Sequence, residues 1–178
     1  SVSQNVQRVG LLDTFEPFKD YNVRKALAHA IDMETVVDVA WGESGVITGN
    51  VYPADCKFYE EFEPYAYDPE LAKTMLAEAG YAEGLELTGV AIAGAPEAKA
   101  MEVMQAMLSE VGVTLNFETT DVSAVIAKEL KGEVNFAVLN STTTTQDPDQ
   151  AISNMKANYA QITVQCERIT ELEHAADD

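Results

Sequence analysis

Residues 85–119 read LELTGVAIAGAPEAKAMEVMQAMLSEVGVTLNFET, and this stretch decides the fold. Its two ends are short apolar runs typical of strands, and the segment between them repeats apolar residues at the helical period near 3.6. The inward face of this helix is expected to carry Met101, Met104, Leu108 and Val111. A strand, a helix and a strand with short connections predict a right-handed crossover between parallel strands.

The same alternation continues toward the C-terminus. DVSAVIAKELKG, residues 121–132, predicts a helix, and VNFAVLN, residues 134–140, predicts a further strand. The inward side chains of that helix are expected to be Val122, Val125, Ile126 and Leu130. From residue 85 onward the fold class is therefore α/β, with a mixed, largely parallel sheet flanked by helices.

The first part of the chain adds a strand and three helices. Residues 6–12 predict a strand, residues 21–32 a helix, and Asp32 can cap a second helix that Gly42 ends. The clearest helix begins at Asp68, with Pro69 at its first position. Its buried stripe is expected to hold Leu71, Met75, Leu76 and Ala79, with Gly80 as the stop.

The composition excludes several functions. Among 178 residues, 30 Asp and Glu stand against 11 Lys and Arg, a net charge of −19, which disfavours nucleic acid and anionic membrane surfaces as partners. No apolar run approaches the roughly 20 residues that cross a bilayer. Cys56 and Cys166 fit no zinc or redox motif, and they are either two free thiols or a pair that the fold brings together.

Catalytic and metal-binding patterns are absent from the sequence. We find no nucleophile elbow, zinc-protease motif, phosphate loop or dinucleotide fingerprint, so no cofactor, no metal ligand and no catalytic residue is predicted. His29 lies within a helical pattern and is expected to be a packed or surface residue rather than a ligand. The chain is not expected to be an enzyme.

A run of hydroxyl residues marks the candidate binding surface. In open α/β sheets, ligands bind outside the carboxyl ends of the strands, and the segment NSTTTT, 140–145, leaves one such end. The turn AIAGAP, 91–96, leaves another. The predicted ligand-binding residues are Ala93, Gly94, Asn140, Ser141, Thr142, Thr143 and Thr144. The alternative is a solvated loop whose hydroxyls bond to local backbone groups.

Four stretches of the chain are similar to a known family. They are PFKDYNVRKALAHAID (17–32), YAYDPELAKTMLAEAGY (65–81), AMEVMQAMLSEVGVTLNFET (100–119) and DPD (147–149). In their order and spacing they resemble the extracytoplasmic solute-binding proteins of ABC importers, family 5, the class for dipeptides, oligopeptides and nickel.

The resemblance implies one lobe of a type II periplasmic-binding-protein clamshell. Residues 1–150 would form the second, C-terminal lobe, and residues 151–178 a helical segment leading back toward a missing N-terminal lobe. ITVQCERITELEHAADD, 162–178, has one apolar face, so it either docks on this lobe or continues into further chain. Arg24 and Asp32, within the most recognisable stretch, are interpreted as structural charges and not as ligand contacts.

The implied function is capture of a peptide or another polar solute for a membrane ABC permease, outside the cytoplasm, in the periplasm or on a lipid anchor. Dipeptide-binding members bind the peptide's ammonium with an Asp and its carboxylate with an Arg. The matching positions here are Thr144 and Ala91, and Ser141 stands where those members have Trp. We therefore expect a longer peptide or a solute that is uncharged at this contact. A ligand sensor of the same fold, or a receptor for a solute such as an oligosaccharide, is the alternative.

Overall fold

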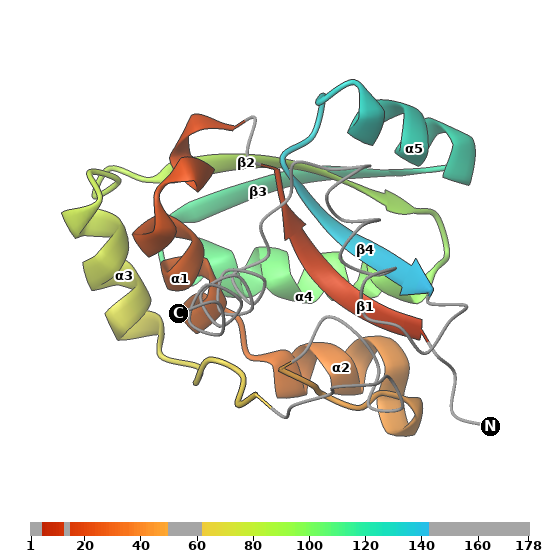
Figure 1. Ribbon diagram of the computed structural model, residues 1–178, viewed down its shortest axis with the longest axis horizontal. Helices are drawn as coiled ribbons and strands as arrows, with labels where there is room; N and C mark the ends of the chain where they lie inside the picture. Colours follow the sequence, from red (N-terminus) through yellow and green to blue (C-terminus); the bar gives the residue numbers. More distant parts are fainter. Residues whose placement is uncertain (1–4, 13–14, 50–61, 143–178) are drawn as a thin grey trace, which may run out of the picture.

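The computed structural model describes residues 5–12, 15–49 and 62–142 as a mixed four-stranded sheet with helices packed around it (Figure 1). The strands are β1 (Asn5–Leu11), β2 (Leu85–Ile92), β3 (Val113–Thr120) and β4 (Phe136–Thr142). The α-helices are α1 (Tyr21–Ala30), α2 (Met33–Trp41), α3 (Pro69–Glu78), α4 (Pro96–Glu110) and α5 (Val122–Leu130). Two short 3-10 helices, Glu16–Lys19 and Gly42–Ser44, precede α1 and follow α2. The predicted α/β class is confirmed.

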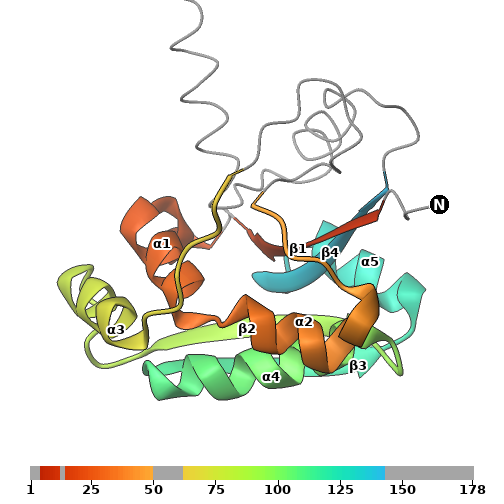
Figure 2. The ribbon, with the colours of Figure 1, turned by 90° about the horizontal axis from the view of Figure 1, so that it is seen from below.

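The order of strands in the sheet is β1-β4-β2-β3. β2 pairs in parallel with β3 from Leu85 opposite Val113 to Ile92 opposite Thr120, and β1 pairs antiparallel with β4 over its whole length. The connection through α4 leads from β2 to one side, and the connection through α5 leads back to the other side. Because right-handed crossovers in opposite directions place their helices on opposite faces, α4 and α5 lie on the two sides of β2 and β3 (Figure 2).

The main core lies between the sheet and α4. Met101, Met104 and Leu108 are fully buried there, and Val111 is nearly so. They pack with strand residues such as Leu87 in one continuous hydrophobic cluster. The inward face predicted for this helix is therefore confirmed.

The inward face predicted for α5 was wrong. Val125 alone of the four expected residues is buried, whereas Val122, Ile126 and Leu130 are 51%, 47% and 67% exposed. The reason is that α5 packs on the sheet through a small cluster in which Val125 meets Val90 and Val134. The helix is turned so that Glu129 is buried, and its apolar stripe lies on the surface of the described part of the chain.

The stripe predicted for α3 also needs correction. Leu76 is buried as expected, but Ala72 takes the second inward position and Leu71 is 40% exposed. Met75 and Ala79 are half-buried. Because α3 packs along α1, its contact face is centred on Ala72 and Leu76, and Leu71 lies one residue outside that face.

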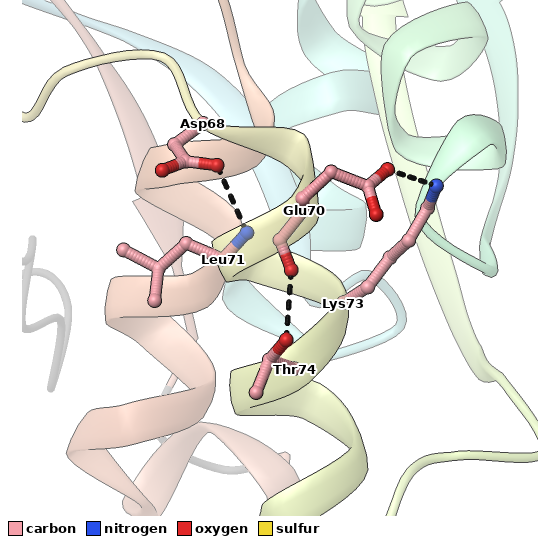
Figure 3. A network of polar contacts seen from close by, with 5 residues as sticks. All are labelled: Asp68, Glu70, Leu71, Lys73 and Thr74. Carbon is pink, nitrogen blue, oxygen red and sulfur yellow. Dashed lines mark hydrogen bonds and ion pairs between the residues drawn. The ribbon is translucent and has the colours of Figure 1, made fainter.

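The helix starts follow the predicted capping. The Asp68 carboxylate accepts a hydrogen bond from the Leu71 amide at 2.9 Å, within a small network at the start of α3 that Figure 3 shows. In the same turn, Lys73 Nζ lies 2.7 Å from Glu70 Oε1. The Asp68 amide itself donates to the His29 carbonyl at 2.8 Å, which joins α3 to α1. Asp32 caps α2 through the amides of Glu34 and Thr35, and Gly42 ends that helix with φ of 55°.

Two polar residues of α1 are buried and serve the fold. Arg24 is 3% exposed and donates to the Phe18 carbonyl; burial lowers the pKa of Arg24, while Asp20 and Tyr21 act in the opposite direction. His29 is buried as well, with Nδ1 2.8 Å from the Ala66 carbonyl, so it is the packed histidine that the sequence predicted. These contacts agree with a structural role for Arg24.

Several predictions concern residues outside the described ranges. They include the pairing of Cys56 with Cys166, the positions of Thr143 and Thr144, and the helical segment 151–178. Within the described residues, no helix is both long and apolar enough to span a bilayer.

Replacing Asp68 by Ala is expected to lower the free energy of unfolding by about 1 kcal/mol, because the first turn of α3 loses its side-chain acceptor. Urea denaturation followed by circular dichroism measures the change. Asp68→Asn is the matched control, since Asn caps helices as well as Asp does. Equal losses in both variants would contradict the capping role.

Candidate ligand-binding site

The topology places a switch point between the carboxyl ends of β2 and β4, and we call this region the crevice edge. β2 lies at the centre, with β3 on one side and β4 on the other, and the two connecting helices cover opposite faces. At a switch point, the connections that leave two neighbouring strands go to opposite faces of the sheet. Ligands of open α/β sheets bind between these connections. In Figure 1 the arrowheads of β2 and β4 point the same way, toward this edge.

The pairing between β2 and β4 joins the middle of β2 to the start of β4. In the described residues the ladder between them has one pair, Gly89 opposite Phe136. Next to it, the Asn135 amide donates to the Thr88 carbonyl at 2.9 Å, and the Asn135 side-chain oxygen accepts from the Thr88 amide at 2.9 Å. The middle of β2 is therefore joined to the start of β4, and in the described part no ladder pair between them lies nearer the carboxyl ends.

The turn after β2 presents backbone to the crevice edge. Gly94 has φ of 76°, a left-handed conformation that glycine adopts without strain, and the Ala95 amide closes the turn on the Ile92 carbonyl at 3.2 Å. The Ala93 amide donates to the Thr120 carbonyl at 2.9 Å, which ties this turn to the end of β3. Ala93 and Gly94 are exposed, and they lie at the edge where the sequence predicted them.

The hydroxyl run begins inside a strand. Asn140, Ser141 and Thr142 are the last residues of β4 and pair with Gln7, Val6 and Asn5 of β1. The sequence had predicted that the strand ends at Asn140 and that Ser141 opens a loop; the strand continues because β1 runs beside it to its end. Asn140–Thr142 thus share one edge with Ala93 and Gly94, while Thr143 and Thr144 lie outside the described residues.

A carboxylate that was not predicted from the sequence lies at the same edge. Glu97 is in the first turn of α4, and its Oε1 accepts from Gln7 Nε2 at 3.2 Å. Gln7 is opposite Asn140 in the ladder, so this hydrogen bond joins β1 to α4 at the carboxyl side of β4. The sequence feature that could have identified Glu97 is its position, three residues after Gly94.

The other acids of this edge have structural partners. The Asp121 carboxylate caps α5 by accepting from the amides of Ser123 and Ala124, at 2.9 and 3.1 Å. Glu118 Oε1 lies 2.9 Å from Lys128 Nζ, and this contact raises the pKa of the Lys128 ammonium. In the described ranges, no group of three or more His, Cys, Asp or Glu residues is placed to hold a metal ion.

A cavity of about 370 Å³ adjoins this region, between β1 and the helices α1, α2 and α4. Its walls are mainly apolar, and the polar residues among them include Gln7, Arg8, Arg24, Ser44 and Thr48. They also include residues 44–48 and 64–65. Of the site residues predicted from the sequence, those that the structure describes are not among the residues that line this cavity.

Comparison with known proteins agrees with this geometry. The profile of bacterial extracellular solute-binding proteins, family 5 Middle, matches residues 2–161. The chain belongs to this family. Its structural neighbours have the type II periplasmic-binding-protein fold, so the predicted fold class is confirmed.

Individual members of family 5 are similar over most of the chain. Heme-binding protein A of Haemophilus influenzae is 30% identical over 155 residues, and the dipeptide-binding protein of Escherichia coli is 28% identical over 173 residues. These alignments cover 84% and 89% of this chain but 28% and 31% of the relatives. The crystal structure of a dipeptide-binding protein from Pseudoalteromonas in complex with Met-Leu superposes with a TM-score of 0.78 and 29% identity, over 86% of this chain and 32% of that one. This chain thus spans about a third of the length of family 5 proteins it matches.

Replacing Gly89 by Ala is expected to cost roughly 1–3 kcal/mol of unfolding free energy, because a Cβ there would lie 2.5 Å from Met101 Cε and 3.0 Å from the Phe136 carbonyl oxygen. Thr88→Ala is the neighbouring control and should cost less, since the Thr88 side chain is exposed and its backbone bonds remain. Denaturant titration measures both. A cost for Gly89→Ala no larger than that of the control would show that β2 and α4 are not held at close contact.

Proposed function

We propose that this chain is the second lobe of an ABC-importer solute-binding protein that captures a peptide or a similar polar solute. The observation that carries the proposal is the family 5 match over residues 2–161, in a chain whose sheet opens at the carboxyl ends of β2 and β4. Members of family 5 are solute-binding proteins and not enzymes, which agrees with the absence of catalytic motifs from the sequence.

In the proposed mechanism the solute bridges two lobes and favours the closed arrangement. A ligand shifts such an equilibrium only by its difference in affinity for the open and closed forms. This lobe would supply the backbone of the turn at Ala93 and Gly94 and the residues from Asn140 to Thr144. The N-terminal lobe would supply the opposing surface, and the closed protein would then bind the ABC permease outside the cytoplasm.

The groups at this edge support a solute that is uncharged where it contacts them. Ala91 is 4% exposed within β2, so the position that corresponds to the carboxylate-binding Arg of dipeptide-binding members carries no charge here. Ser141 and Thr144 are neutral where the resemblance places a Trp and an Asp. Hydroxyl and backbone groups suit uncharged polar partners, so we propose a peptide longer than a dipeptide, or another solute that is neutral at this contact. The relatives themselves are named for ligands as different as heme and dipeptides.

An isolated lobe is expected to bind its solute weakly or not at all, because it keeps half of the binding surface and cannot close. Isothermal titration of the two-lobed protein and of this chain, with the same solute, compares the two affinities. Equal affinities would contradict the clamshell proposal and would favour a binding module that acts by itself.

Peptides of three to five residues are expected to raise the melting temperature of the two-lobed protein more than free dipeptides do. The reason is that this lobe has neutral groups at the positions that bind the termini of a dipeptide in the related proteins. A thermal-shift panel with matched alanine peptides of two to five residues measures the difference. Stabilisation by dipeptides alone would show that the charged anchors come from elsewhere.

A further inference from the structure

The Gln7–Glu97 pair at the crevice edge has more hydrogen-bonding capacity than the described fold uses. Gln7 Nε2 donates to Glu97 Oε1 at 3.2 Å, which fixes the amide so that its oxygen points away from the carboxylate. Gln7 Oε1 is buried and has no hydrogen-bond donor among the described residues. Because buried polar atoms are nearly always hydrogen-bonded, this oxygen calls for a donor from outside these residues.

Glu97 differs from the four glutamates that form ion pairs among the described residues. Glu16, Glu70, Glu118 and Glu133 each lie within 4 Å of a lysine ammonium, at distances from 2.6 to 3.8 Å. Glu97 is half-buried, and in the described ranges its recorded partner is a neutral amide rather than a cation.

Two cations lie near the pair along the chain: Arg8 follows Gln7 in β1 and is buried, and Lys99 lies two residues after Glu97 on α4. The turn 93–97 and the end of β3 with its following residue, 118–121, contain no Lys, Arg or His. The chain as a whole carries a net charge of −19, so its field attracts positive groups and repels negative ones. A cationic group that approaches this edge would therefore meet two groups. One is the Glu97 carboxylate, which has no counter-ion among the described residues, and the other is the buried Gln7 Oε1, which has no donor among them.

We propose that Glu97, positioned by Gln7, is a specificity-determining residue that binds an ammonium or similar cationic group of the solute. An ammonium has three donors, enough to satisfy both the carboxylate and the Gln7 oxygen. This inference rests on the proposed function and narrows the solute class. The solute would be neutral at the hydroxyl-bearing end of β4 and positive where it meets β1 and α4.

The test uses the two-lobed protein and pairs of peptides that differ only in one amine. One pair is trialanine amide with a free or an acetylated N-terminus, and another is end-blocked Ala-Lys-Ala with a free or an acetylated lysine. Isothermal titration is expected to show that the wild-type protein prefers the amine of at least one pair by about tenfold or more, as charge-assisted hydrogen bonds imply. This preference should decrease as salt concentration rises.

Glu97→Gln keeps the size of the side chain and an acceptor for Gln7, and it should abolish the preference for the amine over the acetylated peptide. Glu102→Gln, on the exposed side of the same helix, is the matched control and should retain the preference. Gln7→Met should reduce the ratio of the two affinities, a quantity that a purely structural role for Gln7 would not change.

The outcomes separate this inference from the proposed function. If the peptides bind but the wild type shows no preference, or Glu97→Gln retains it, the inference is overturned and the Gln7 oxygen is satisfied by water only, while the proposed function stands. If neither member of any pair binds, the proposed peptide-binding function fails and the inference fails with it.

Discussion

The close contact at Gly89 is the constraint on which the rest of the structure depends. At this residue β2 meets β4 on one side, β3 on the other and α4 below, and a side chain would lie 2.5 Å from Met101 Cε. The absence of a Cβ lets α4 approach the sheet, which buries Met101 completely. It also places the single ladder pair between β2 and β4, Gly89 with Phe136, at the point from which the two strands run to the crevice edge.

The position of that pair explains why the crevice lies where it does. Asn135 and Gly89 hold the two halves of the sheet together at the middle of β2 and the start of β4, before the connections that follow these strands. The turn at Gly94 is held to β3 through the Ala93 amide, and the end of β4 is held to β1 throughout its length. A binding surface made of backbone and small side chains needs such rigid supports, because a misplaced hydrogen-bonding group loses most of its value.

The sequence predicted the class, the order of the elements and the edge that carries the candidate site. It succeeded at α4, where the apolar spacing and the buried face agree residue by residue, because the sheet covers that helix along its length. It failed at α5, where the same kind of spacing gave three exposed side chains, and at Leu71 of α3. Periodicity identifies which face of a helix is apolar, but it does not say whether the described chain covers that face.

Glu97 shows why the candidate site could not be predicted completely from the sequence. Its importance depends on Gln7, ninety positions earlier in the chain, and no local pattern connects a residue of β1 to the first turn of α4. The connection arises only because β1 pairs antiparallel with β4 and so brings its amino end to the carboxyl edge of the parallel strands. The edge strand therefore does more than complete the sheet, because it adds the polar side chain of Gln7 to the candidate site. The charge at this candidate site depends on the topology, and residues 91, 141 and 144 describe only the neutral part of it.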